Sequence, residues 1–228
     1  FRRVLFRSVY IRPSFWVVLA IFGGALSISS VEDLIYPALF VIAGFIAILS
    51  HEMGHALVGR RLGGGQQTIV LELFGGLTSS HGMQLTRGGR ALMILAGPMM
   101  TLLLGIISLW LTWNIVAPVM ASHNLDFWDL AISPFTAALI SPKLYILSCL
   151  IMIGEWWTLL NLLPIYPLDG GQLIAQYIRS PRKVFMTGFI TAILIGLLSF
   201  QLFHGYFIPI FMALFAYSNY REYKNAPF

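Results

Sequence analysis

Three ionisable residues stand within five positions of one apolar stretch, in the segment His51-Glu52-Met53-Gly54-His55. Residues four apart lie on the same face of a helix, so both imidazoles can bind one metal ion. Glu52 lies beside that face, where its carboxylate can take a proton from a metal-bound water. The pattern predicts a metal centre with His51 and His55 as ligands and Glu52 as a catalytic acid or base.

The apolar stretch around these residues is itself a predicted membrane span. Ionisable side chains inside a membrane span are costly and usually functional. On a water-soluble helix the same five residues can be an ordinary surface run, because such short motifs also occur by chance. The membrane setting therefore favours the metal centre over a chance arrangement.

Two histidines do not complete a catalytic zinc site, which usually has three protein ligands and an open position for water. The acidic candidates for the third ligand are Glu72, Glu155 and Asp169, whereas Glu32, Asp33, Asp126 and Asp129 map to the outer side. Glu155 lies in the middle of a span, where it lines a water path or is a buried carboxyl between helices. Glu72 lies in a loop and can simply face solvent.

Depth in the membrane favours Asp169. His51 lies about 26 Å, and Asn161 about 27 Å, below the outer ends of their spans at the helical rise per residue. Pro164 and Pro167 then interrupt the helix, so a non-helical stretch can carry Asp169 back towards the histidines. The alternative is a plain turn or helix cap, because Asp-Gly is a common turn pair.

The composition predicts the elements that must position these residues. Of the 228 residues, 58% are hydrophobic and 10% are charged, against about 25% charged in soluble domains. This excludes an ordinary soluble globule and a disordered chain, and a single cysteine excludes a disulfide framework. A multi-pass, all-α membrane protein remains, forming one domain over residues 1–228. Six spans are expected, at about 14–30, 34–58, 91–116, 143–163, 184–203 and 205–220, with a turn near His204 between the last two.

The basic residues predict the orientation of these spans. With the N-terminus inside, 13 of the 14 Lys and Arg residues fall on the inner side, and only Lys143 lies outside. Such a bias predicts a multi-pass protein in a cell membrane with both termini in the cytoplasm. The net charge of +5 is therefore read as orientation in the lipid bilayer and not as binding of nucleic acid.

A β-favouring stretch at 66–80 includes Gly75-Gly76 and predicts a short hairpin beside the membrane. Such an element is either a plain inner loop or an edge to which an unwound substrate can add as a strand. Pro98, near the start of the third span, either kinks that helix to shape a cavity or is a tolerated proline near a helix end.

The segment HEMGH, followed more than 100 residues later by NLLPIYPLDGG, resembles the site-2 protease family of intramembrane zinc metalloproteases. Ala96-Gly97-Pro98 and Gly75-Gly76 are similar to segments of that family. The resemblance covers about residues 34–175, with helices 14–30 and 184–220 as accessory elements. The spacing is most similar to the small, six-span type that processes sporulation factors in prokaryotes.

The resemblance implies one Zn²⁺ per chain, held by His51, His55 and Asp169. It implies that Glu52 is the catalytic acid/base and that Asn161 supports substrate or transition state, although Asn161 can instead hydrogen-bond between helices. Gly75, Gly76 and Pro98 are then candidates for holding a substrate strand or shaping the cavity.

The expected activity is hydrolysis of peptide bonds within or near transmembrane segments of membrane-anchored proteins, as in regulated intramembrane proteolysis. The substrate and any regulatory membrane partner are not identified by the sequence. One alternative is a metal-ion transporter or channel that uses the same His/Asp cluster, and another is an inactive scaffold. A third is a zinc hydrolase in which a glutamate, Glu155, replaces Asp169 as the third ligand.

Overall fold

The computed structural model describes residues 8–72, 75–82, 84–123 and 127–227. These residues form two compact units, 1–158 and 159–228. The single-domain organisation expected from the sequence stays a prediction.

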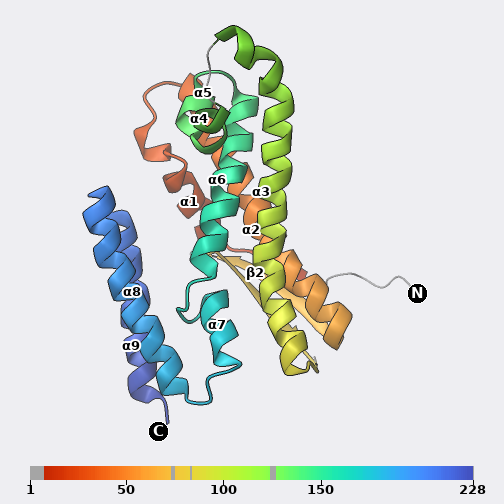
Figure 1. Ribbon diagram of the computed structural model, residues 1–228, viewed down its shortest axis with the longest axis vertical. Helices are drawn as coiled ribbons and strands as arrows, with labels where there is room; N and C mark the ends of the chain where they lie inside the picture. The colour runs from red at the N-terminus through yellow and green to blue at the C-terminus, as the bar shows by residue number, and fades with distance from the viewer. Residues whose placement is uncertain (1–7, 73–74, 83, 124–126, 228) are drawn as a thin grey trace. The chain divides into compact units, whose positions relative to one another are not determined.

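The first unit contains four long or medium helices, two short ones and a small sheet (Figure 1). The helices are α1 (Pro13–Phe22), α2 (Ile35–Gly63), α3 (Arg87–His123), α4 (Phe127–Ile132), α5 (Pro134–Ala138) and α6 (Pro142–Asn161), whose last three residues belong to the second unit; the strands are β1 (Ser8–Ile11), β2 (Gln66–Glu72) and β3 (Gly75–His81). Two 3₁₀ turns, Ala25–Ser27 and Glu32–Leu34, connect α1 to α2.

Four helices are long and apolar enough to cross a membrane by length and composition: Glu32–Gly63, Arg87–Ala117, Pro142–Asn161 and Pro181–Leu202. They match four of the six expected spans. The expected span 14–30 is shorter in the structure, because α1 ends at Phe22 and Gly24 adopts a left-handed φ of 87° that does not continue a helix. The last expected span is a helix too, but Arg221, Glu222 and Lys224 lie in its final turns.

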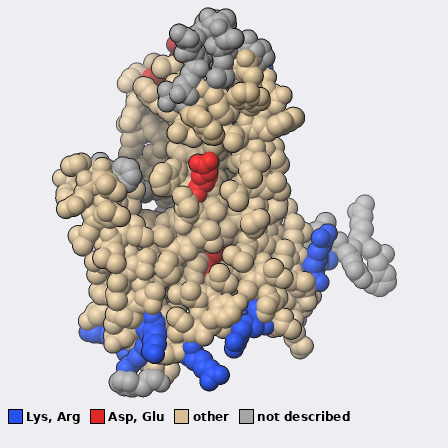
Figure 2. Space-filling model, in the orientation of Figure 1, with Lys and Arg blue, Asp and Glu red and all other residues tan. Residues whose placement is uncertain are grey.

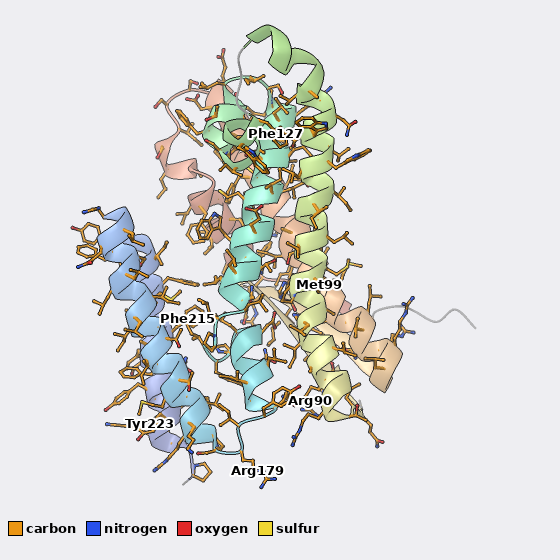
Figure 3. All side chains as sticks on the ribbon, viewed as in Figure 1. Arg90, Met99, Phe127, Arg179, Phe215 and Tyr223 are labelled. Carbon is orange, nitrogen blue, oxygen red and sulfur yellow. The ribbon has the colours of Figure 1, made fainter. Side chains whose placement is uncertain are left out.

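Apolar side chains cover the outside of the long helices. Most of the face in Figure 2 carries neither basic nor acidic side chains. On α3 the exposed side chains include Leu92, Met99 and Trp110, and Figure 3 shows Met99 on this helix. A soluble monomer rarely exposes such a large apolar surface, whereas a helix in lipid must. The described surface therefore agrees with the predicted multi-pass helical fold.

The sheet has the order β1-β2-β3. The predicted hairpin is confirmed, with β2 and β3 antiparallel and Thr68 opposite Ser79. β1 was not predicted from the sequence; it pairs in parallel with β2 and places Ser8 opposite Thr68. Parallel pairing joins residues far apart in the chain and leaves no local turn signal.

One core cluster joins the sheet to the helices. Ile69 and Leu71 of β2 are fully buried and pack with Phe15 and Leu19 of α1 and Ile48 of α2. These contacts hold the hairpin against the middle of α2. The HEMGH segment begins just after Ile48 in this helix, so the core holds the sheet beside the predicted metal centre.

The second unit contains the end of α6, a turn at 162–168 and three helices: α7 (Asp169–Ala175), α8 (Pro181–Phe203) and α9 (Phe207–Asn225). α8 and α9 lie side by side (Figure 1). The predicted turn near His204 is confirmed, since His204 ends α8 with a left-handed φ of 51°. A buried cluster of Ile165, Ala192, Met212 and Ala216 packs the turn 162–168 against this helix pair.

Candidate metal centre

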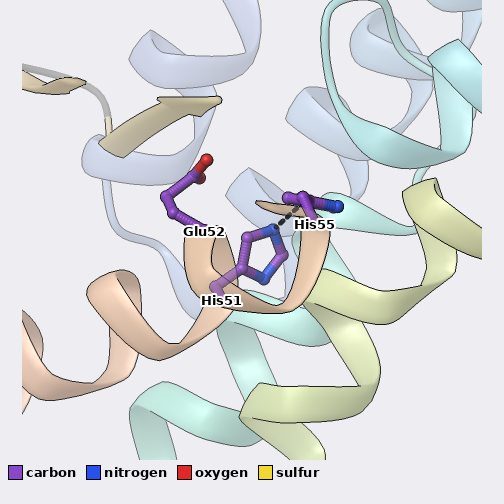
Figure 4. Close-up of side chains that lie close together, drawn as sticks. All are labelled: His51, Glu52 and His55. Atoms are coloured by element: carbon purple, nitrogen blue, oxygen red, sulfur yellow. Dashed lines mark hydrogen bonds between the residues drawn. The ribbon is translucent and has the colours of Figure 1, made fainter. Parts of the chain in front are cut away.

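The two histidines of α2 lie on one buried face of the helix, as their spacing predicts. Their Nε2 atoms are 3.1 Å apart, and Figure 4 shows the two rings meeting at these atoms. His51, Glu52 and His55 are all buried, and they form a group in which one ligand atom of each residue lies within 4.8 Å of the others. The structure therefore brings together the three residues of the predicted motif.

A carbonyl group sets the chemical state of one imidazole. Nδ1 of His55 lies 2.8 Å from the main-chain oxygen of Met93 on α3. A carbonyl accepts only, so Nδ1 carries the proton and Nε2 keeps its lone pair. Metal-binding histidines commonly donate their second ring nitrogen to a carbonyl or carboxylate in this way. His55 is thus held in the tautomer that a metal ligand needs.

The spacing of the two ring nitrogens fits zinc. Two nitrogens bound at about 2.0–2.1 Å in a tetrahedral site are about 3.3 Å apart. The 3.1 Å separation of the Nε2 atoms agrees with this value. Two neutral imidazoles and a carboxylate are also the donor types that catalytic zinc sites use.

Gly97 on α3 leaves the space into which these ring nitrogens point. A Cβ atom at position 97 would overlap Nε2 of His55 and would lie 2.8 Å from Nε2 of His51. Only a residue without a side chain permits this close approach of α3. Segment 96–98 was part of the family resemblance, but the sequence alone indicated no role for Gly97.

Glu52 is held from the other side by β3. The hydroxyl group of Thr78 donates to Glu52 Oε2 at 2.6 Å, and it also lies 3.2 Å from the main-chain oxygen of Glu52. Gly76 faces the same carboxylate so closely that a Cβ atom there would overlap it. Thr78 was not predicted from the sequence, because its contact depends on the register of β3 and no motif marks it.

Gly75 and Pro98 lie at two helix contacts. Gly75 has a φ of 126°, and a Cβ atom there would meet the ring of Trp157. The carbonyl oxygen of Pro98 accepts hydrogen bonds from Thr101 at 3.0 Å and from Thr158 on α6 at 3.3 Å. α3 continues as one helix through Pro98, and the cavity-shaping role predicted for this proline stays a prediction.

Comparison with known proteins identifies the family. The sequence profile of peptidase family M50 matches residues 39–203, which include both predicted motifs. The chain belongs to peptidase family M50. This confirms the resemblance to site-2 proteases that the HEMGH and NLLPIYPLDGG segments indicated.

Two M50 relatives show how far the similarity extends. A zinc metalloprotease of Methanocaldococcus jannaschii is 27% identical over 203 residues, which are 84% of this chain and 51% of that protein. The Rip3 protein of Mycobacterium tuberculosis is 31% identical over 132 residues, which are 58% of this chain and 29% of that protein. The chain spans about half or less of the length of these relatives.

A solved site-2 protease structure confirms the fold. The site-2 protease from Methanocaldococcus jannaschii superposes with a TM-score of 0.60 and 22% identity, covering 94% of this chain and 90% of that chain. Together with the four membrane-capable helices, membership of M50 makes this chain an integral membrane protein.

The other predicted site residues of this M50 chain lie in different surroundings. Asp169 is buried as the first residue of α7, and Asn161 is buried as the last residue of α6. Both belong to the second unit, and their roles stay predictions. Glu155 is exposed on α6, which does not fit the alternative of a buried carboxyl between helices. Glu72 forms an ion pair with Arg12 at 3.0 Å.

Proposed function

We propose that this chain is an intramembrane zinc metalloendopeptidase that hydrolyses peptide bonds within or near transmembrane segments of membrane-anchored proteins. The observation that carries the proposal is the buried pair of Nε2 atoms 3.1 Å apart, with Glu52 beside them on a membrane-capable helix. Membership of M50 supports the same activity.

In this proposal His51, His55 and Asp169 hold one zinc ion per chain. Bound there, zinc would lower the pKa of a water molecule and polarise the peptide carbonyl group. Nε2 of His55 keeps its lone pair for the metal, because the protonated Nδ1 donates a hydrogen bond to the Met93 carbonyl group. Glu52 takes a proton from the attacking water and returns a proton to the leaving amine. Thr78 bonds to Oε2, so Oε1 is the carboxylate oxygen that receives the proton.

The sheet suggests how the substrate is held. Among the described residues β3 is an edge strand, and Gly76 and Thr78 of this strand contact Glu52. A helix must unwind before its peptide bonds can be attacked, and an extended segment can add to a free strand edge through main-chain hydrogen bonds. We therefore assign Gly75 and Gly76 to substrate binding. We also assign Asn161 to support of the substrate or the transition state, as the family resemblance implies.

The proposal also covers the orientation of the protein in the cell and the kind of substrate it cleaves. Both termini lie in the cytoplasm of a prokaryotic cell, where the basic residues gather in the predicted topology. The substrate is a membrane-anchored protein, released by regulated intramembrane proteolysis. The spacing of the two motifs favours the small, six-span type that processes sporulation factors.

Removing the metal tests the proposed function. The purified chain in detergent micelles, mixed with epitope-tagged single-span membrane proteins, should cut at least one of them. A zinc chelator should abolish the cleavage, and added Zn²⁺ should restore it. Zinc flux into vesicles without any cleavage would contradict the protease and favour the metal transporter.

Thr78 should affect the rate of cleavage more than the binding of substrate. Thr78→Val keeps the shape of the side chain and removes the donor to Glu52 Oε2, so we expect kcat to fall about 10–100-fold with KM nearly unchanged. Thr78→Ser keeps the hydroxyl group and should stay within about threefold of wild type. Initial rates over a range of substrate concentrations measure both constants.

Ser80→Ala is the matched control for Thr78. Ser80 lies two residues further along β3 and donates to Gln67 within the sheet at 2.5 Å. Its loss removes a hydroxyl group from the same strand without touching Glu52. Equal losses of kcat in Ser80→Ala and Thr78→Val would contradict a specific role for Thr78.

A further inference from the structure

A turn directly precedes Asp169. Residues 162–168 connect α6 to α7 without helical structure, and Asp169 is the first residue of α7. Main-chain hydrogen bonds from Ile165 to Leu163 at 2.7 Å and from Leu168 to Ile165 at 2.8 Å tighten this turn. The position of the Asp169 carboxylate therefore depends on what holds the turn.

A buried asparagine of α9 holds it. Asn219 is 1% exposed, and its Nδ2 donates to the main-chain oxygen of Tyr166 at 2.6 Å. The same nitrogen donates to the main-chain oxygen of Phe215, one turn earlier on α9, at 2.9 Å. An amide nitrogen carries two hydrogens, so both bonds form together. Asn219 thus ties a carbonyl three residues before Asp169 to the helix pair.

The surroundings of Asn219 are shaped for this contact. A Cβ atom at Gly188 of α8 would overlap Oδ1 of Asn219, so only glycine leaves room for the amide. Fully buried Ile165 packs into the cluster with Met212, and the ring of Tyr166 lies edge-on to Phe185, with centroids 5.5 Å apart. Figure 3 shows Phe215, whose carbonyl accepts the second bond, on this helix pair.

We propose that Asn219 is a positioning residue for Asp169 and thereby for the metal centre. This inference rests on the proposed function, in which Asp169 is the third zinc ligand. A buried polar side chain that loses its partner is costly, so the bond to Tyr166 keeps the start of α7 in one place. Asn219 lies beyond the residues 39–203 that the M50 profile matches. In this proposal α9 helps to position a zinc ligand, and it is therefore more than an accessory helix.

Zinc affinity of the full-length chain in detergent, measured by competition with a chromophoric chelator, tests the proposal. Asn219→Leu removes the amide at similar volume, and we expect zinc to bind about 10–100-fold more weakly, as for other residues that orient ligands. Asn219→Ser can still bond to Phe215 one turn back but is too short to reach Tyr166. It should weaken zinc binding in the same direction, and it decides the matter if the leucine variant does not fold.

Ser199→Ala is the matched control. Ser199 is a buried polar residue of α8 that donates to Gly196 within its own helix at 2.9 Å. Its removal should leave zinc affinity unchanged. A second readout needs no metal: amide hydrogens of residues 165–172 should exchange faster in Asn219→Ser and at the wild-type rate in Ser199→Ala.

Asp169→Ala separates failure of this inference from failure of the proposed function. If Asp169→Ala weakens zinc binding but both Asn219 variants bind zinc as wild type does, only the inference about Asn219 is overturned. If Asp169→Ala itself binds zinc normally, the ligand set is wrong and the inference falls with it. In the Asp169→Ala background Asn219→Ser should cause no further loss; an additional loss would show general disruption and would also overturn the inference.

Discussion

Glu52→Gln should abolish peptide cleavage while leaving zinc bound. Glutamine has the shape of glutamate but cannot accept a proton at neutral pH, and general acid–base catalysis contributes about 10²–10⁴-fold to such reactions. We therefore expect a fall of about 10³-fold or more in kcat. Co-expression with epitope-tagged single-span membrane proteins measures the cleavage, and metal analysis of the purified chain measures the zinc.

The geometry explains why zinc should stay in this variant. The two imidazoles meet through their own Nε2 atoms, and the Met93 carbonyl holds His55. Glu52 instead contacts Thr78 and Gly76 of β3. Normal cleavage by Glu52→Gln would refute the assigned mechanism. If the variant lost both its zinc and its cleavage activity, Glu52 would be a zinc ligand and not an acid or base.

Gly97→Ala should prevent normal zinc binding although it adds only one methyl group. The new Cβ atom would overlap Nε2 of His55 and crowd Nε2 of His51, the two atoms that would hold the ion. Changes to the residues around metal ligands typically cost about 10–100-fold in metal affinity, so we expect zinc affinity to fall by about that factor and cleavage to fall with it. Chelator competition measures the affinity.

Gly105→Ala provides a matched control on the same helix. A Cβ atom there would meet only the Ile151 carbonyl oxygen, at an ordinary distance of 4.0 Å. Alanine also favours the helix over glycine, so this variant should be at least as stable as wild type and bind zinc normally. If both alanine variants bind zinc equally well, the space next to the histidines is not what Gly97 provides.

The metal motif was predictable because it depends on local periodicity. A spacing of four residues places His51 and His55 on one face of any helix, whatever surrounds it. Their apolar neighbours likewise predicted the span, and α2 covers all of the expected range 34–58 except its first residue. The hairpin at 66–80 was also local, since β2 ends at Glu72 and its partner β3 begins at Gly75.

The contacts around the motif were not predictable from spacing. β1 joins the sheet by pairing with residues about 60 positions later, and Thr78 reaches Glu52 only in one strand register. The expected first span failed for a local reason, because Gly24 interrupts an apolar run and α1 ends at Phe22. For Glu155 the sequence left open a water path or a buried carboxyl, because exposure depends on how helices pack around the residue.

The sequence by itself determined the class of protein and the chemistry at its centre. The composition is that of a membrane protein. Three ionisable residues in one membrane span are energetically unfavourable and therefore indicated a functional site. Only the tertiary structure decided which groups surround the motif, namely the Met93 carbonyl, Gly97 and Thr78, and that Asn219 holds the turn before Asp169 within the second unit. The reason is physical, since helical periodicity acts over four residues, whereas close packing brings together residues that no spacing in the chain relates.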